Sequence, residues 1–284
     1  MTPHSPASGS PLQALQASLR QPPGVAGKPR LMVAGATGAL GNEVLRRLVG
    51  SGRYAHTEVL ATEPMTTGMA GVGIALAEDA SMIEAWAARP QRVHTGLVMF
   101  EPPRLYYGRE RALWTPLPGQ LPALARWLKR CGAQTLVVVV PHAAGRLPDA
   151  LKRGLADLDE QLVASLGFER VLLVRSARKA EGLAGKSFLE KTASWMLSTL
   201  KYMIPATEQP VRPAKLAEFI DAALQVLPQG THVAAPELLW QANQSGGTSR
   251  RDGQEDNSMQ GIVRRWLAAR SNPDENSTPT AKPD

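Results

Sequence analysis

Pro29 to Gly52 read PRLMVAGATGALGNEVLRRLVGSG, an order of residue types typical of a strand, a turn and a helix. The apolar run at 31–34 predicts a short buried strand. Apolar residues then recur at helical spacing, at Leu40, Val44, Leu45 and Leu48. Because glycines separate the two patterns, the stretch predicts a βα unit closed by a glycine-rich turn.

The spacing of the glycines in this turn is typical of a dinucleotide-binding site. Gly35 permits a tight reversal, Gly38 lets the backbone approach a pyrophosphate, and Gly41 lets the helix pack against the strand. The free N–H groups and the positive dipole end of the helix then face an anion. The alternative is a structural βα turn without a ligand. The candidate cofactor-binding residues are Gly35, Ala36, Thr37, Gly38, Ala39, Leu40 and Gly41.

Strand and helix patterns alternate along the first two thirds of the chain. Strands are expected at 58–61, 96–100, 135–140 and 170–174, and helices at 79–88, 121–131 and 148–166. The run TLVVVV at 135–140 suits a strand that is covered on both faces. The alternation predicts an α/β fold with a doubly wound parallel sheet, the Rossmann arrangement.

The C-terminal third departs from this alternation. Helices are expected at 187–204 and 214–227, with a final strand at 231–235, and we expect a small substrate-side lobe from about residue 176. The predicted organisation is a disordered arm at 1–27, the dinucleotide-binding domain with its lobe at 28–240, and a flexible tail at 241–284.

One amphipathic helix is expected within the tail, at 258–270. Its apolar stripe consists of Met259, Ile262, Val263, Trp266 and Leu267. Three surfaces are open as the contact for this stripe: the protein's own core, a partner subunit, or an anionic membrane surface.

Composition narrows the classes of partner. The net charge is +7, but Lys and Arg are scattered without a basic run or a nucleic-acid-binding motif, so no nucleic acid is expected. No segment has the roughly 18 to 20 consecutive apolar residues of a membrane span, and a secretory signal is not apparent, which predicts a soluble cytoplasmic protein. The single cysteine, Cys131, is interpreted as a structural residue. The five histidines are not clustered, and no metal site is expected.

The order of GATGALG, VVVVPHAAG and VLLVR resembles an atypical, extended short-chain dehydrogenase/reductase of the NmrA-like and Tat-interacting-protein-like kind. The resemblance covers about residues 29–236, and its specific motif is the glycine turn. It implies a Rossmann fold that binds NAD or NADP.

The catalytic pair of that family is absent from this chain. Active members use a Tyr-x-x-x-Lys pair, in which the lysine lowers the pKa of the tyrosine so that the phenol can protonate a carbonyl oxygen. If Glu160 aligns with the acidic residue that commonly follows the pair, the tyrosine position falls at Lys152 and the lysine position at Ala156. No tyrosine occurs between Tyr107 and Tyr202.

Four other side chains are candidates for the site. His142 and Lys152 are the candidate proton donors, each with the alternative of a loop or solvated residue. Arg175 either holds a phosphate or carboxylate or pairs with a nearby acid. Glu63 lies where a ribose-reading residue is expected, and its charge favours NAD over NADP.

Two functions remain open from the sequence. The first is an NAD(P)-binding, oxidoreductase-like protein that reduces an unidentified carbonyl compound. The second is a catalytically silent dinucleotide-binding redox sensor or assembly factor. The substrate and the oligomeric state are not specified by any motif.

Overall fold

The computed structural model of the chain describes residues 27–79, 81–142, 155, 157–177, 211–244 and 258–271. Within these residues one parallel sheet has the strand order β3-β2-β1-β4-β5-β6-β7. Its strands are β1 (Arg30–Ala34), β2 (His56–Ala61), β3 (Val72–Leu76), β4 (Thr95–Met99), β5 (Thr135–His142), β6 (Arg170–Ala177) and β7 (Gly230–Ala234). The order reverses beside β1, as in doubly wound sheets. The predicted fold class is therefore confirmed.

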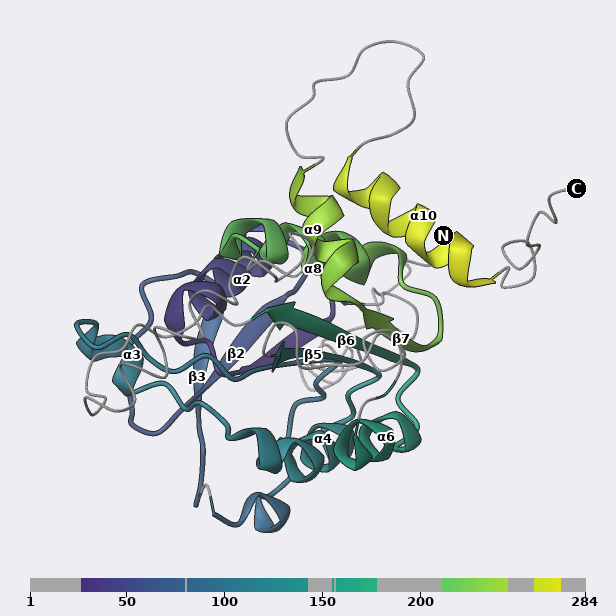
Figure 1. The fold of residues 1–284 in the computed structure, drawn as a ribbon. Coiled ribbons are helices and arrows are strands. Elements are labelled where there is room, and N and C mark those ends of the chain that lie inside the picture. The colour runs from purple at the N-terminus through teal and green to yellow at the C-terminus, as the bar shows by residue number, and fades with distance from the viewer. Residues whose placement is uncertain are drawn as a thin grey trace, which may run out of the picture.

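Helices cover both faces of the sheet (Figure 1). One layer contains α2 (Gly38–Gly50), α8 (Pro213–Val226), α9 (Pro236–Gln244) and α10 (Met259–Ser271). The opposite layer contains α4 (Leu121–Arg130), α6 (Leu158–Ser165) and the 3-10 helix η1 (Ile83–Ala85). Two short helices, α3 (Gly108–Arg111) and η2 (Pro118–Gln120), follow β4 and precede α4 along the chain.

The sheet is stable because its central strands bury apolar side chains on both faces. Val137 and Val139 of β5 belong to the core beneath α2 and α8, whereas Leu136 and Val138 belong to the core beneath α4. This two-sided burial is the reason the run at 135–140 is unbroken. The α4 core also contains Trp86, which makes edge contacts with two other tryptophans, Trp114 at 5.3 Å and Trp127 at 5.2 Å.

Two predicted helices differ from the sequence pattern within the residues that the structure describes. At 79–88 only the single turn of η1 forms, because Trp86 already has extended backbone angles (φ −59, ψ 133). Of the helix predicted at 148–166, residues 148–154 and 156 lie outside the described residues, and the described helix α6 begins at Leu158. Asp157 before it is extended, and its carboxylate accepts a hydrogen bond from the backbone N–H of Glu160 at 2.8 Å as the N-cap of α6.

Four elements were not predicted: β3, α3, η2 and α9. β3 pairs with β2 from Thr57↔Val72 onward. α9 follows β7 directly and buries Leu239 and Ala242. Residues 1–26 of the arm expected at 1–27 and the helix expected at 187–204 lie outside the described residues.

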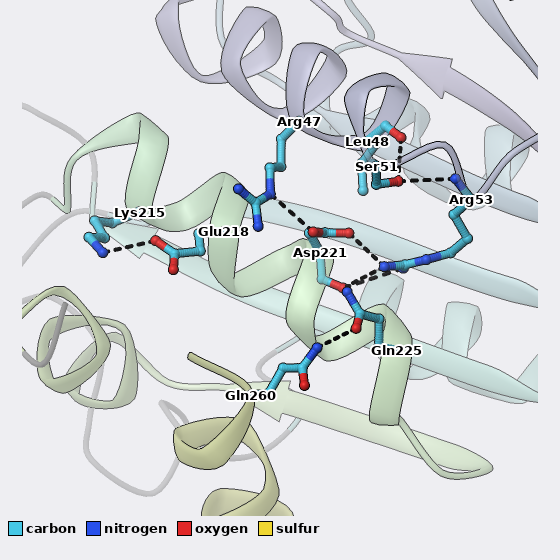
Figure 2. Close-up of polar contacts among 9 residues, drawn as sticks. All are labelled: Arg47, Leu48, Ser51, Arg53, Lys215, Glu218, Asp221, Gln225 and Gln260. Atoms are coloured by element: carbon cyan, nitrogen blue, oxygen red, sulfur yellow. Dashed lines mark hydrogen bonds and ion pairs between the residues drawn. The ribbon is translucent and has the colours of Figure 1, made fainter. Parts of the chain in front are cut away.

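The described part of the C-terminal third joins the main sheet and its helix layer. β7 extends the sheet beside β6, and α8 packs against α2. Asp221 of α8 fastens this contact by accepting from Arg47 Nε at 3.0 Å and from Arg53 Nη2 at 2.7 Å (Figure 2). The side chain of Asp221 is 5% exposed, whereas those of Arg47 and Arg53 are 52% and 23% exposed, so a buried carboxylate pairs here with two partly solvated arginines.

The amphipathic helix expected at 258–270 is α10, and it packs on α8. Val263 is completely buried, and the ring centroids of Phe219 and Trp266 are 6.1 Å apart. Gln260 also donates a hydrogen bond to Gln225 of α8 (Figure 2). The sequence left three surfaces open for the apolar stripe of this helix. In the structure the stripe packs against the protein's own core.

Candidate functional site

The glycine turn after β1 has the backbone conformation that its sequence requires. Gly35 (φ +77) and Gly38 (φ +72) occupy the left-handed region, which disfavours residues with a Cβ atom. A Cβ on Gly35 would lie 2.0 Å from the carbonyl oxygen of Met99, and one on Gly41 would lie 2.6 Å from the carbonyl carbon of Ala36. Two of the three glycines are thus needed for close backbone packing whether or not a ligand binds.

This turn lies at the point where the strand order of the sheet reverses. β1 has β2 on one side and β4 on the other. In open α/β sheets, ligands bind outside the carboxyl ends of the strands at this position. The chain that leaves β4 therefore enters the same region as the chain that leaves β1.

The chain after β4 supplies two carboxylates to the start of α2. We call residues 101–115 the covering segment. The Leu40 N–H donates to Oε2 of Glu101 at 2.6 Å, and the Gly38 N–H donates to Oε2 of Glu110 at 3.1 Å. These N–H groups have no partner within the helix. The donor set therefore fits anionic oxygens, and in this structure the chain's own carboxylates provide them.

Glu110 is held by several donors at once. Asn42 Nδ2 donates to its Oε1 at 2.8 Å, and the Arg104 backbone N–H donates to its Oε2 at 3.0 Å, while the Arg104 side chain forms an ion pair with the same carboxylate. Burial alone would raise the pKa of Glu110, but the hydrogen bonds from Arg104 and from the Gly38 N–H outweigh burial, so the pKa lies below its ordinary value. The group is thus held as a carboxylate.

The covering segment is also attached to the turn through Thr37. Its hydroxyl donates to the Glu101 carbonyl oxygen at 2.5 Å and lies 2.7 Å from the Thr115 hydroxyl. Since the Thr37 proton is used on Glu101, the Thr115 hydroxyl is the donor in the second contact. The Gly35 N–H donates to the Trp114 carbonyl oxygen at 3.1 Å. Both ends of the segment are therefore fixed against the turn.

Arg175 and Glu63 lie near the carboxyl ends of β6 and β2. Arg175 is 2% exposed, and its Nη2 donates to Oε2 of Glu160 at 2.6 Å. The sequence left two roles open for this arginine, and the structure shows the pairing with a nearby acid. Glu63 is exposed two residues after β2. Its expected contact with a ribose remains a prediction.

The two candidate proton donors are less completely described. His142 is the last residue of β5, and its backbone is in register with Ala177 of β6. The strand is thus two residues longer than expected, which places His142 in the sheet and not in the loop after it. Lys152 lies outside the described residues.

Cys131 has the structural role expected from its sequence context. It is 3% exposed, and its sulfur accepts a hydrogen bond from the Arg89 backbone N–H at 3.4 Å. Burial raises the pKa of the thiol, which keeps it protonated and poorly nucleophilic at neutral pH.

Sequence reasoning missed Glu101 and Glu110, whose carboxylates accept from N–H groups at the start of α2. Topology could have placed their segment, because residues after a strand next to β1 must pass the glycine turn. No motif marks these two acids among the many in the chain. Their role follows only from the path of the loop.

Other kinds of site are not found in the part of the chain that the structure describes. There, no group of three or more His, Cys, Asp or Glu side chains has the arrangement of a metal site. The helices of the described ranges include none that combines the length and apolar character needed to cross a bilayer.

Comparison with known proteins gives distant structural likeness only. No family model and no curated protein matches the sequence. Similar solved structures include uronate dehydrogenase from Agrobacterium tumefaciens (17% identity, 90% of this chain and 92% of the other, TM-score 0.42). A nucleoside-diphosphate-sugar epimerase from Staphylococcus aureus matches at 14% identity over 87% and 92% of the chains, with a TM-score of 0.41. The Bordetella bronchiseptica enzyme WbmG, solved in complex with NAD, matches at 13% identity over 80% and 81%, with a TM-score of 0.43.

The strand order itself defines the fold class, an α/β Rossmann-type sheet. The resemblance to short-chain dehydrogenases/reductases that the sequence shows is consistent with this strand order. At such identities and TM-scores, the ligands and substrates of those proteins say nothing about the ligand of this chain.

Proposed function

We propose that this protein binds a nicotinamide dinucleotide at the glycine turn, as an oxidoreductase-like member of the Rossmann class. The observation that carries the proposal is the chemistry of the turn. The N–H groups of Gly38 and Leu40 each hold an anionic oxygen, at the switch point of a parallel sheet. A pyrophosphate would need the same two donors.

A second candidate is a dinucleotide-binding protein without catalysis, acting as a redox sensor or assembly factor. The absence of any tyrosine between Tyr107 and Tyr202 favours it, since the phenol of the family's catalytic pair has no counterpart. The engagement of Arg175 with Glu160 also favours it, because this arginine is then committed to a buried pair.

NAD is preferred over NADP in this proposal. The Glu63 carboxylate after β2 would accept from a ribose hydroxyl and would repel a 2′-phosphate. A bound dinucleotide would supply hydride chemistry, while this chain's contribution would be the donors of the turn and the acid after β2.

Binding is tested by calorimetric titration of the purified full chain with NAD⁺, NADH, NADP⁺ and NADPH. We expect NAD(H) to bind more tightly, and Glu63→Lys to shift the preference toward NADP(H). Glu78→Lys, which makes the same charge change at another exposed residue after a neighbouring strand, is the matched control. If none of the four dinucleotides binds to wild type or to a variant with the covering carboxylates neutralised, the proposal is wrong.

Catalysis is tested separately with a panel of aldehydes, ketones and quinones in the presence of NADH or NADPH. The first candidate predicts turnover that falls when His142 or Lys152 is replaced. The second predicts no oxidation of the cofactor, with binding retained. Turnover in the usual range of about 1 to 1000 per second would rule out the silent alternative.

A further inference from the structure

The covering segment blocks the donors that the proposed ligand needs. Its contact of 2.6 Å from the Leu40 nitrogen to Oε2 of Glu101 is a charge-assisted hydrogen bond. A Cβ on Gly38 would lie 2.3 Å from the carboxyl carbon of Glu101, which shows how closely this side chain covers the turn. A pyrophosphate oxygen and the Glu101 carboxylate cannot occupy this position together.

The segment is anchored unevenly. Its C-terminal end is fixed by Trp114, which is 5% exposed and packs against Trp86. The part before it is held mainly by polar contacts, because Leu105 and Tyr106 are 76% and 95% exposed and bury little apolar surface. Opening of residues 101–111 would therefore break polar contacts to the turn but expose little buried apolar surface.

We propose that Glu101 and Glu110 form a carboxylate latch, which occupies the anion-binding N–H groups of the glycine turn and must be released before a dinucleotide can bind. This inference rests on the proposed function. The latch competes with the ligand for the same donors, so the apparent affinity is lower than the intrinsic affinity by the fraction of molecules in which the latch is open. By the same coupling, a bound dinucleotide stabilises the open segment.

The test compares wild type with a Glu101→Gln/Glu110→Gln double variant in the full chain. Glutamine keeps the size of each side chain but removes the charge that competes with pyrophosphate. Glu110 is buried beside Arg104, so its replacement risks unfolding the protein. The single Glu101→Gln variant changes only a partly exposed position and therefore tests the latch without that risk. Glu84→Gln is the charge-matched control, since Glu84 lies on η1 and pairs with Arg126 of α4, on the other layer.

Calorimetric titration with NAD⁺ is the first measurement. We expect the double variant to bind about tenfold more tightly or better, Glu101→Gln to show part of this gain, and Glu84→Gln to match wild type. Equal affinities for wild type and both latch variants would overturn the latch and leave the proposed function standing. Absence of binding in all variants would overturn both.

Amide hydrogen exchange in the ligand-free protein is the second measurement, and it needs no ligand. We expect the Gly38 and Leu40 amides to be protected in wild type and in Glu84→Gln, and to exchange faster in the latch variants. Rapid exchange of both amides in wild type would show that the carboxylates do not hold them in solution, which would overturn the inference.

Discussion

The carboxylate of Glu110 accepts a hydrogen bond from the Gly38 N–H at 3.1 Å, which joins the first residue of α2 to a side chain 72 positions later. Together with the hydrogen bonds from Arg104, this contact keeps Glu110 ionised and gives its contribution to stability a defined dependence on pH. Since its pKa in the folded protein lies below the ordinary value of about 4.3, Glu110 stabilises the fold above that value. The contribution is lost as the pH falls through the lowered pKa.

We therefore expect the melting temperature of Glu110→Gln to lie below that of wild type at pH 7, and this gap to narrow as the pH is lowered from 5 to 3. Scanning calorimetry at each pH measures the gap. Glu84→Gln is the control, because Glu84 is an exposed acid for which any gap should be small. A gap of equal size at pH 7 and pH 3 would contradict the predicted role of the charge.

The cluster around Asp221 predicts a second effect on stability (Figure 2). Asp221→Ala removes the acceptor shared by Arg47 and Arg53, which tie α2 to α8. Both arginines are partly exposed and can be solvated, so we expect a loss of roughly 1 to 3 kcal/mol, less than for a fully buried pair. Denaturant unfolding measures this loss.

Glu218 on the same helix is the control for Asp221. It pairs with Lys215 three residues earlier in a partly exposed i,i+3 contact (Figure 2). Glu218→Ala should change the stability by no more than about 0.5 kcal/mol. Similar losses in the two variants would show that the Asp221 cluster has no special role in holding α2 and α8 together.

The sequence predicted those features of the fold that depend on apolar periodicity or on glycine. The βα unit at Pro29 to Gly52 and the buried strand at 135–140 formed as expected, because both patterns allow few alternatives. β3 was missed because Val72 to Leu76 contains a glycine and only five residues, so its pattern is too short to distinguish from a loop. The strand forms because the edge of β2 offers it hydrogen bonds.

The sequence predicted the backbone part of the candidate site, which is the glycine turn. It did not predict the carboxylate side chains that contact this turn. Gly35 and Gly41 are constrained by close backbone packing and Gly38 by its left-handed backbone angles, which a motif can report. The positions of Glu101 and Glu110 depend on the path of a loop between β4 and α4, and no local pattern encodes that path. Likewise, the partner of Arg175 depends on how α6 lies against β6.

The Arg175–Glu160 pair predicts a third effect, because both side chains are 2% exposed. Replacing either residue alone breaks this buried ion pair, at an expected cost of about 3 to 5 kcal/mol. Replacing both, as Arg175→Met with Glu160→Leu, should recover much of this loss. Denaturant unfolding of the two single variants and the double variant gives the coupling. Additive losses would show that the two charges do not depend on each other.

The fourth prediction concerns α10, whose apolar stripe lies in the core of the domain. Val263 is completely buried, whereas Ala268 on the same helix is exposed. Val263→Asp places a carboxylate in the core without a designed partner and should destabilise the protein by about 3 kcal/mol, whereas Ala268→Asp should have little effect. Thermal unfolding measures both variants.

Truncation after Gln244 removes the whole helix and tests the same packing without introducing a charge. Since Met259, Ile262 and Val263 then no longer cover α8, we expect a clear fall in melting temperature. The full chain should not sediment with anionic vesicles, because the stripe that would enter the membrane is already buried. Binding to vesicles by the full chain, together with an unchanged melting temperature on truncation, would mean that α10 leaves the core in solution. The apolar surface of α8 would then be exposed, and the self-docked arrangement would be wrong.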